Sequence, residues 1–401
     1  MKKGWQTKTL EEVADSDCAL SYGIVQPGDE FVDGLPVVRP TDLTMKVIKL
    51  SELKRIDPKL AAGYQRTTLQ GGELLLCVRG STGTISIASS ELSGANVTRG
   101  IVPIRFKKTL VDTSFGYYLM IADQVQRQIR EKTYGAALMQ INIRDLRNIV
   151  LTFPPLAEQQ RIVGLLDEAF EGVATAKANA EKNLQNARAL FESHLQSIFA
   201  QHGPGWRHDQ LDALTDPDTP ITYGVVKPGD EGEITFVRGG DLVRGKVRPT
   251  QLRTITRAVS DQYRRTLLRG GELLICLVGQ PGQVAVAPIE LAGANIARQV
   301  GLIRLKKMID AEFVRYFLQS APGVEALGAR ESGSVQQVIN LGELRQVSVP
   351  YPEFTQQRKI VAGLEKFEGE TQRLARLYER KLAALEALKK SLLHQAFAGE
   401  L

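Results

Sequence analysis

At 401 residues the chain is longer than one hydrophobic core usually serves, so two or more domains are expected. Its 43% hydrophobic and 24% charged residues exclude a collagen-like or a largely disordered chain. No run of eighteen apolar residues and no apolar N-terminal segment occurs, which predicts no membrane span, no secretory signal and a cytoplasmic location. Three cysteines without a CxxC pair form neither a disulfide framework nor a zinc motif.

Short apolar runs broken by glycine or proline follow one another through residues 1–153. LPVV at 35–38, ELLLCV at 73–78 and TISIA at 84–88 are such runs, and they predict β-strands. Residues 113–130 predict one helix. This part of the chain is therefore expected to be a strand-rich domain.

Residues 154–200 have a different pattern. Pro154 and Pro155 end the last predicted strand, and the residues that follow lack proline and are rich in Ala, Leu, Glu, Lys and Arg. They predict one long helix, in which apolar positions alternate three and four residues apart, as in a coiled coil. The positions of this seam are Val163, Leu166, Phe170, Val173, Lys177, Ala180, Leu184, Ala187, Phe191, His194 and Ile198.

The whole arrangement then occurs a second time. GGELLLCVRGSTG at 71–83 returns as GGELLICLVGQPG at 270–282, so residues 201–351 repeat the first domain. Residues 352–401 repeat the long helix. The second seam is Ile360, Leu364, Phe367, Thr371, Leu374, Tyr378, Lys381, Leu385, Leu388 and Leu392. Each helix is too long to be covered by one small domain, so the two helices are expected to pair.

The positive charge lies outside the helices. Residues 154–200 and 352–401 together hold 13 basic and 13 acidic side chains. Residues 1–153 carry 20 basic against 16 acidic side chains, and residues 201–351 carry 18 against 16. Fourteen of those eighteen are arginines, whose planar fork suits phosphates and guanine edges. Two basic domains on neutral helices indicate a nucleic-acid partner.

No set of residues predicts catalysis by this chain. RGSTG at 79–83 lacks the spacing of a phosphate-binding loop, and Asp42 with Glu52 and Lys54 matches a nuclease pattern only loosely. Cys77 and Cys276 lie in apolar runs, which favours a place in the core. No Ser/His/Asp or Cys/His set lies in matching positions of the two copies. A non-catalytic chain is therefore expected.

The order of domain, helix, domain and helix resembles the specificity subunit of type I restriction-modification enzymes. The resemblance covers the whole chain and includes the helix openings PPLAEQQRIV and PEFTQQRKIV and the closings LQSIFA and LLHQAFAGEL. It implies an α+β fold: two repeated strand-rich α/β target recognition domains, 1–153 and 201–351, separated by two long antiparallel coiled-coil helices, with pseudo-two-fold symmetry.

The resemblance also implies partners. Each recognition domain would read one half of a split site in double-stranded DNA, while the helices act as a spacer and dock two modification subunits. Restriction subunits would join these. S-adenosylmethionine, ATP and Mg²⁺ would belong to the partner subunits, and this chain would bind no cofactor. Partner-binding residues are expected at the helix starts: Gln159, Gln160, Arg161, Gln356, Gln357 and Arg358.

Candidate DNA-binding residues come from comparing the copies. Charged residues shared by both suit phosphates or a common base, and polar residues that differ are candidate base readers. The candidates are Arg39, Thr41, Arg79, Ser81, Arg99, Gln140, Arg238, Arg244, Lys246, Gln280, Arg298, Gln299, Gln336 and Gln337. For the shared arginines, a surface salt bridge is an equal alternative.

Two other functions remain open at this point. One is a stand-alone DNA methyltransferase or nuclease with duplicated DNA-binding domains, which would need cofactor or metal motifs. The other is a scaffold that joins proteins through its coiled coil, which would show no salt-dependent binding to DNA.

Overall fold

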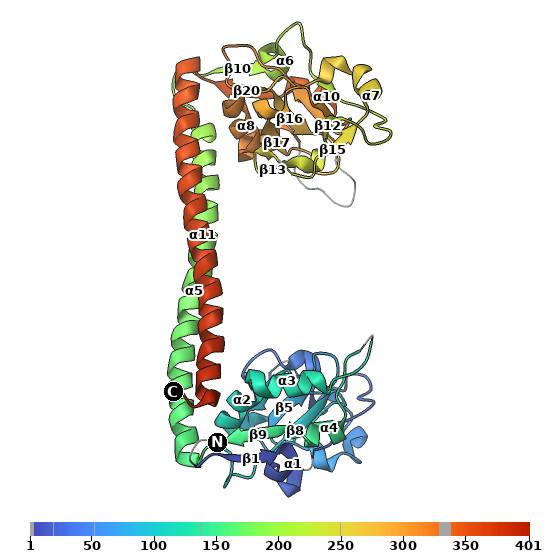
Figure 1. Cartoon of the computed structure of the whole chain (residues 1–401), viewed down its shortest axis with the longest axis vertical. Helices are drawn as coiled ribbons and strands as arrows, with labels where there is room; N and C mark the ends of the chain where they lie inside the picture. The colour runs from blue at the N-terminus through green and yellow to red at the C-terminus, as the bar shows by residue number, and fades with distance from the viewer. Residues whose placement is uncertain (1–3, 19, 52, 137, 249, 329–337) are drawn as a thin grey trace. The chain divides into compact units, whose positions relative to one another are not determined.

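The computed structural model describes residues 4–18, 20–51, 53–136, 138–248, 250–328 and 338–401. The chain divides into two compact units: unit 1 is Met1–Asn179 with Lys381–Leu401, and unit 2 is Ala180–Arg380. Each unit contains one strand-rich part and a segment of both long helices, α5 (Leu156–Ala200) and α11 (Phe354–Ala398) (Figure 1). The prediction of two long helices is confirmed.

Unit 1 is built on three small sheets, with strand orders β4-β2-β7, β3-β6-β5-β8 and β1-β9. Helix α2 packs on β5 and β6 through the fully buried Phe115 and Leu119. The strands are β1 (Gln6–Thr9), β2 (Leu35–Val38), β3 (Val47–Ile48), β4 (Lys54–Ile56), β5 (Leu74–Cys77), β6 (Ile85–Ala88), β7 (Asn96–Val97), β8 (Ile101–Ile104) and β9 (Val150–Phe153). The helices are α1 (Leu10–Val13), α2 (Thr113–Ile121), α3 (Asp123–Glu131) and α4 (Ile143–Arg147).

Unit 2 repeats these elements in the same order and adds β11, β13 and α7. Its sheets are β15-β12-β18, β11-β19-β16-β17, β13-β14 and β10-β20. The strands are β10 (Arg207–Gln210), β11 (Thr222–Tyr223), β12 (Ile234–Val237), β13 (Leu242–Val243), β14 (Lys246–Val247), β15 (Arg253–Ile255), β16 (Leu273–Cys276), β17 (Val284–Val286), β18 (Asn295–Ile296), β19 (Val300–Ile303) and β20 (Ser348–Tyr351). The helices are α6 (Leu211–Leu214), α7 (Arg257–Asp261), α8 (Ala311–Gln319), α9 (Ala321–Ala326) and α10 (Leu341–Gln346). The predicted α+β repeat is thus confirmed.

The repeated GGEL sequence forms the turn that leads into the central strand of each unit. Gly71 and Gly72 have φ of 91° and 86°, a backbone conformation that side chains with a Cβ rarely adopt. The buried Glu73 closes this turn by accepting hydrogen bonds from the N–H groups of Gln70 and Gly71, at 2.8 and 2.9 Å. Its side chain also pairs with Arg105. The repeat therefore preserves a turn and a buried carboxylate.

The single helix expected over residues 113–130 is wrong. Two helices, α2 and α3, are separated at Ala122, whose ψ of 144° is extended. The same break occurs in unit 2 between α8 and α9, at Ser320. Helical propensity does not reveal the break at Ala122, because alanine is a good helix former.

Within each unit the segments of α5 and α11 pack antiparallel. In unit 1, Phe170 contacts Lys389 and Lys177 pairs with Glu386 at 2.8 Å. In unit 2, Arg188 pairs with Glu379 at 2.9 Å and Phe191 packs against Phe367. In each unit, therefore, the residue number in α11 falls as the number in α5 rises. The predicted α5 seam is buried or half-buried except at His194. None of the helices in the described parts of the chain is long and apolar enough to cross a membrane.

The predicted α11 seam is correct in its first half, one residue out of phase at Leu374 and Lys381, and exposed at Leu388. Leu374 and Leu388 are 37% and 46% exposed, and Lys381 is exposed as well. The half-buried Ala375 and Leu382 take the inward positions instead. Both phases contain leucines, so the apolar pattern alone did not distinguish them.

Candidate nucleic-acid interface

Four segments of unit 1 meet at one place: those that follow β2 and β5, the one that precedes β8, and the one that precedes α4. Val78 donates its N–H to the carbonyl of Gly100 at 2.8 Å, and Ile141 donates to the carbonyl of Val78 at 3.0 Å. A Cβ at Gly100 would lie only 2.5 Å from Cγ of Pro40, so the loops touch there. We call this surface edge 1. Its candidate residues are Arg39, Thr41, Arg79, Ser81, Arg99 and Gln140.

Unit 2 builds the same surface from the equivalent loops. Leu277 donates its N–H to the carbonyl of Gln299 at 2.7 Å, and Ile339 donates to the carbonyl of Leu277 at 3.0 Å. A Cβ at Gly239 would lie 2.6 Å from Sγ of Cys276. We call this surface edge 2. Its candidate residues are Arg238, Gln280, Arg298 and Gln299.

One arginine on each edge is held by an aspartate three residues later. Arg39 donates through Nε and Nη2 to the two oxygens of Asp42, at 3.2 and 2.9 Å. Arg238 and Asp241 do the same at 3.2 and 3.1 Å. These hydrogen bonds to Asp42 raise the pKa of Arg39, while its side chain remains 41% exposed. The carboxylate fixes each guanidinium in place at the surface.

The same contact removes support for the nuclease pattern. Both oxygens of Asp42 accept hydrogen bonds from Arg39, and Glu52 lies outside the described residues. In the parts of the chain that the structure describes, no three His, Cys, Asp or Glu side chains are grouped as metal ligands.

A second pair of arginines is exposed on the two edges. Arg99 and Arg298 each donate a backbone N–H, to the carbonyls of Ile24 and Val225 respectively, both at 2.8 Å. Their side chains are exposed, and neither has an ion-pair partner among the described residues. The backbone is thus fixed while the cation faces solvent, an arrangement that suits a phosphate.

Arg244 and Lys246 do not lie on edge 2. They belong to the two-residue hairpin between β13 and β14, whose turn residues Arg244 and Gly245 have φ of 50° and 80°. The hairpin lines a crevice beside α11, together with Glu368 and Gln372. The structure therefore separates these two predicted residues from the others.

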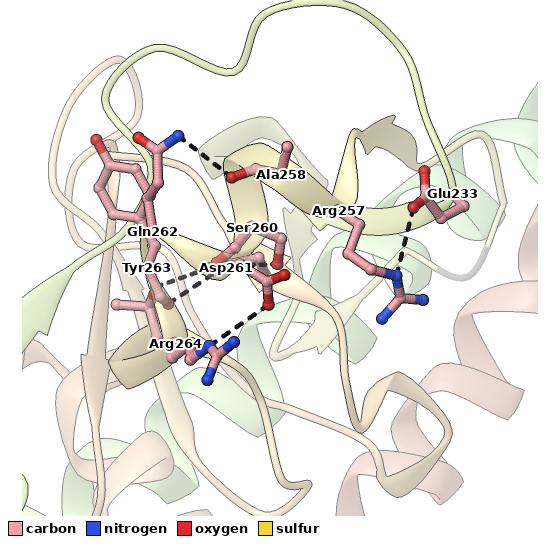
Figure 2. A network of polar contacts seen from close by, with 10 residues as sticks. Glu233, Arg257, Ala258, Ser260, Asp261, Gln262, Tyr263 and Arg264 are labelled. Carbon is pink, nitrogen blue, oxygen red and sulfur yellow. Dashed lines mark hydrogen bonds and ion pairs between the residues drawn. The ribbon is translucent and has the colours of Figure 1, made fainter.

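Other arginines of unit 2 cluster around α7. Figure 2 shows Arg257 beside Glu233 and Arg264 beside Asp261, with nitrogen–oxygen distances of 3.4 and 3.5 Å. Glu233 precedes β12, whereas Arg238 follows it, so this cluster lies at the other end of the strand from edge 2. The high number of arginines in residues 201–351 therefore does not indicate where edge 2 lies.

Two predicted partner-binding residues require correction. Gln159 is fully buried: its Oε1 accepts from the N–H of Asp112 at 2.9 Å, and its Nε2 donates to the carbonyls of Leu110 and Pro154, both at 2.8 Å. Gln357 is equally buried and makes the equivalent three hydrogen bonds. Both amides anchor a helix start to its own unit, so neither is available to another protein.

The remaining candidates at the helix starts are exposed. These are Gln160, Arg161, Gln356 and Arg358. Arg161 also pairs with Glu158 at 2.7 Å and donates to the carbonyl of Leu401 at 2.7 Å. Gln336 and Gln337, which were predicted to contact DNA, lie outside the described residues.

Tyr22 is a residue of edge 1 that the sequence comparison missed. Its hydroxyl donates to the carbonyl of Ile141 at 3.4 Å, next to Gln140. Burial raises the pKa of Tyr22, so it stays a neutral donor. Its repetition in YGIVQPGD and YGVVKPGD was the available signal.

Comparison with known proteins gives one consistent family. The family model described as "Type I restriction modification DNA specificity domain" matches residues 2–184 and 223–380. The type I restriction enzyme EcoBI specificity subunit of Escherichia coli is 26% identical over an alignment of 430 positions, which covers 99% of this chain and 86% of that protein. The MjaVIII specificity subunit of Methanocaldococcus jannaschii is 19% identical, over 75% of this chain and 73% of that protein.

Solved structures share the fold. A chain from a study of complex assembly and conformational transition of the type I R-M system has a TM-score of 0.78 at 21% identity, covering 100% of this chain and 99% of that one. The HsdS subunit from Thermoanaerobacter tengcongensis has a TM-score of 0.63 at 21% identity, covering 100% and 98%.

Proposed function

The chain belongs to the family of type I restriction-modification DNA specificity domains, and we propose that its two units each read one half of a split DNA site. The observation that carries the proposal is the duplication of one loop surface, edge 1 and edge 2, on one fold. The backbone hydrogen bonds of the two edges match and two arginines recur, while other polar side chains differ between them. One scaffold that presents two sets of side chains fits a target with two different halves.

The proposal gives the long helices a separate role. With 13 basic and 13 acidic side chains in residues 154–200 and 352–401, the helices lack the excess of positive charge that would bind DNA phosphates. They set the number of unread base pairs and dock two modification subunits. The exposed Gln160, Gln356 and Arg358 are the residues we assign to that docking.

The chain itself performs no chemistry in this proposal. S-adenosylmethionine belongs to the modification subunits, and ATP with Mg²⁺ belongs to restriction subunits that join the complex. The competing function, a stand-alone methyltransferase or nuclease, requires the isolated chain to bind S-adenosylmethionine or a metal ion. Equilibrium dialysis of the purified chain with S-adenosylmethionine separates the two, since the proposal predicts no binding.

Methylation mapping tests the reading function. The chain is co-produced with its modification subunit in a host that lacks adenine methylation, and the methylated adenines are located by sequencing. The proposal predicts one motif in two parts with a fixed unread gap. Methylation at a single uninterrupted motif, or methylation by the chain without its partner, would contradict it.

A further inference from the structure

Arg79 of unit 1 and Val278 of unit 2 occupy the same backbone position. Each lies two residues after the end of its central strand, and each carbonyl accepts a hydrogen bond from the preceding cysteine Sγ at 3.2 Å. Each also forms a β-bridge, Arg79 with Gln140 and Val278 with Val338. The backbones match, so the difference between the units at this point is confined to the side chain.

The backbone around Arg79 is held on both sides. Val78 donates its N–H to Gly100, and Gly80 donates to the carbonyl of Met139, both at 2.8 Å. The backbone that carries Arg79 is therefore fixed in place, as a residue that reads one base requires.

The Arg79 side chain lacks the partner that Arg39 has. Its Nε is buried and makes no hydrogen bond among the described residues, and no carboxylate there forms an ion pair with it. A buried N–H donor without an acceptor is costly, so a site that keeps one indicates an acceptor that arrives with a ligand. Packing does not require a charged residue here, because unit 2 places valine on the same backbone.

We infer that Arg79 reads a guanine in the half-site of unit 1. This inference rests on the proposed function and adds a specific base to it. Guanine offers two acceptors, O6 and N7, on its major-groove edge, which match the arginine fork. Leu138 and Met139, which lie beside Gly80, are 45% and 44% exposed, so part of the surface next to Arg79 is apolar, which a phosphate contact does not require. The half-site of unit 2 lacks this contact, because Val278 has no donor.

Two substitutions test the inference by methylation mapping of the complex with its modification subunit. R79V installs the residue of unit 2, and we expect methylation at sites with the read guanine to fall ~10- to 100-fold, with that position becoming degenerate. R79K keeps the charge but loses the planar fork, so it should also relax that position. The second half-site should stay unchanged in both variants.

A duplex carrying 7-deazaguanine at the read position supplies a second measurement, independent of variant folding. This base lacks N7, so the wild-type complex should bind the modified duplex less tightly, and the R79V complex should bind both duplexes equally. Equal binding of the two duplexes by the wild-type complex, together with full rescue of the motif by R79K, would indicate a phosphate contact and overturn the inference. A relaxed base other than guanine would also overturn it. If the wild-type complex yields no split motif, the proposed function itself fails, which is a different result.

Discussion

In unit 1 the cation beside the long helices comes from the bend that precedes β3, whereas in unit 2 it comes from a helix. Lys46, next to β3, donates to Asp167 of α5 at 2.6 Å and lies 4.6 Å from the ring centre of Tyr118. In unit 2, Arg315 of α8 lies 3.7 Å from the ring centre of Tyr316. The hydroxyl of Tyr118 donates to Asp167, as that of Tyr316 donates to Glu368.

The loss of the Lys46 cation in unit 2 and the presence of Arg315 there compensate each other. Gly245 of unit 2 stands where unit 1 has Lys46, and a Cβ there would lie 2.4 Å from Nη1 of Arg315. Glycine therefore leaves room for the arginine. Because a second substitution compensates for it, the exchange of Lys46 for Gly245 preserves the packing of each unit. Among the described residues, no such compensating substitution accompanies the exchange of Arg79 for Val278, so this difference can serve DNA recognition.

The largest effect is expected from changing the distance between the units along the chain. Four residues inserted after Ala178 add about one helical turn, roughly 6 Å, which is close to two base-pair steps of about 3.4 Å. Methylation at the original gap should be lost and should reappear at a longer one. Methylation mapping measures this, and an unchanged gap at full activity would show that the helices do not set it.

Removing the buried carboxylate should affect unit 1 more than unit 2. Glu73→Ala leaves Arg105 without its acid and should lower the free energy of unfolding by about 3–5 kcal/mol. Glu272→Ala should cost less, about 1–3 kcal/mol, because Arg304 still donates to the carbonyls of Arg265 and Leu267 at 3.0 and 2.7 Å. Urea unfolding of both variants gives the comparison, and equal losses would contradict this account of the two pairs.

Adjacent glutamines in α5 offer a matched test of the buried anchor. Gln159→Ala leaves the N–H of Asp112 and two carbonyls without their partner, at a cost of about 2–3 kcal/mol. Gln160→Ala, at the next and exposed position, should change stability by less than about 0.5 kcal/mol. Thermal unfolding distinguishes them. Similar losses of stability in the two variants would contradict the anchoring role of Gln159 and would make it a candidate partner-binding residue again.

The smallest effect concerns the pH dependence of unit 1. Desolvation raises the pKa of Asp167, but hydrogen bonds from Lys46 and Tyr118 outweigh it and hold the pKa below its usual value. A lowered pKa stabilises the fold above the unfolded-state value of about 3.9, and this contribution is lost as the pH falls through the folded-state value.

Asp167→Asn should therefore lower stability at pH 7 by about 0.5 kcal/mol, because the carboxylate is 48% exposed and solvent screens it. The difference from the wild type should shrink below about pH 4. Unfolding curves at several pH values measure it, with Glu168→Gln at the exposed neighbouring position as the control. A difference independent of pH would contradict the assigned pKa shift.

The local sequence pattern predicted strands and helices correctly where the spacing of apolar residues and the positions of glycine and proline indicated the same element. Strand LPVV and both long helices lie where the sequence placed them. The α11 phase failed because Leu374 and Ala375 both suit a helix, and only packing against α5 selects one of them. The break at Ala122 likewise has no signal in local propensity.

The candidate site was harder to predict because it depends on contacts between distant residues. Aligning the repeats found Arg39, Arg79 and Arg99, which the fold brings to one edge. The same alignment could not show that Gln159 is buried, since glutamines are usually exposed and two of its three hydrogen-bond partners, Asp112 and Leu110, are far away in sequence. It also could not separate Arg244 from edge 2.

Duplicating one unit tests the central claim most directly. A chain in which residues 205–351 are replaced by a second copy of residues 4–153 is produced with the modification subunit, and its methylated adenines are mapped against those of the wild type. Two units that each read one half-site predict a motif in which the half-site of unit 1 occurs twice and that of unit 2 is absent. An active complex that still methylates the wild-type motif would contradict the account.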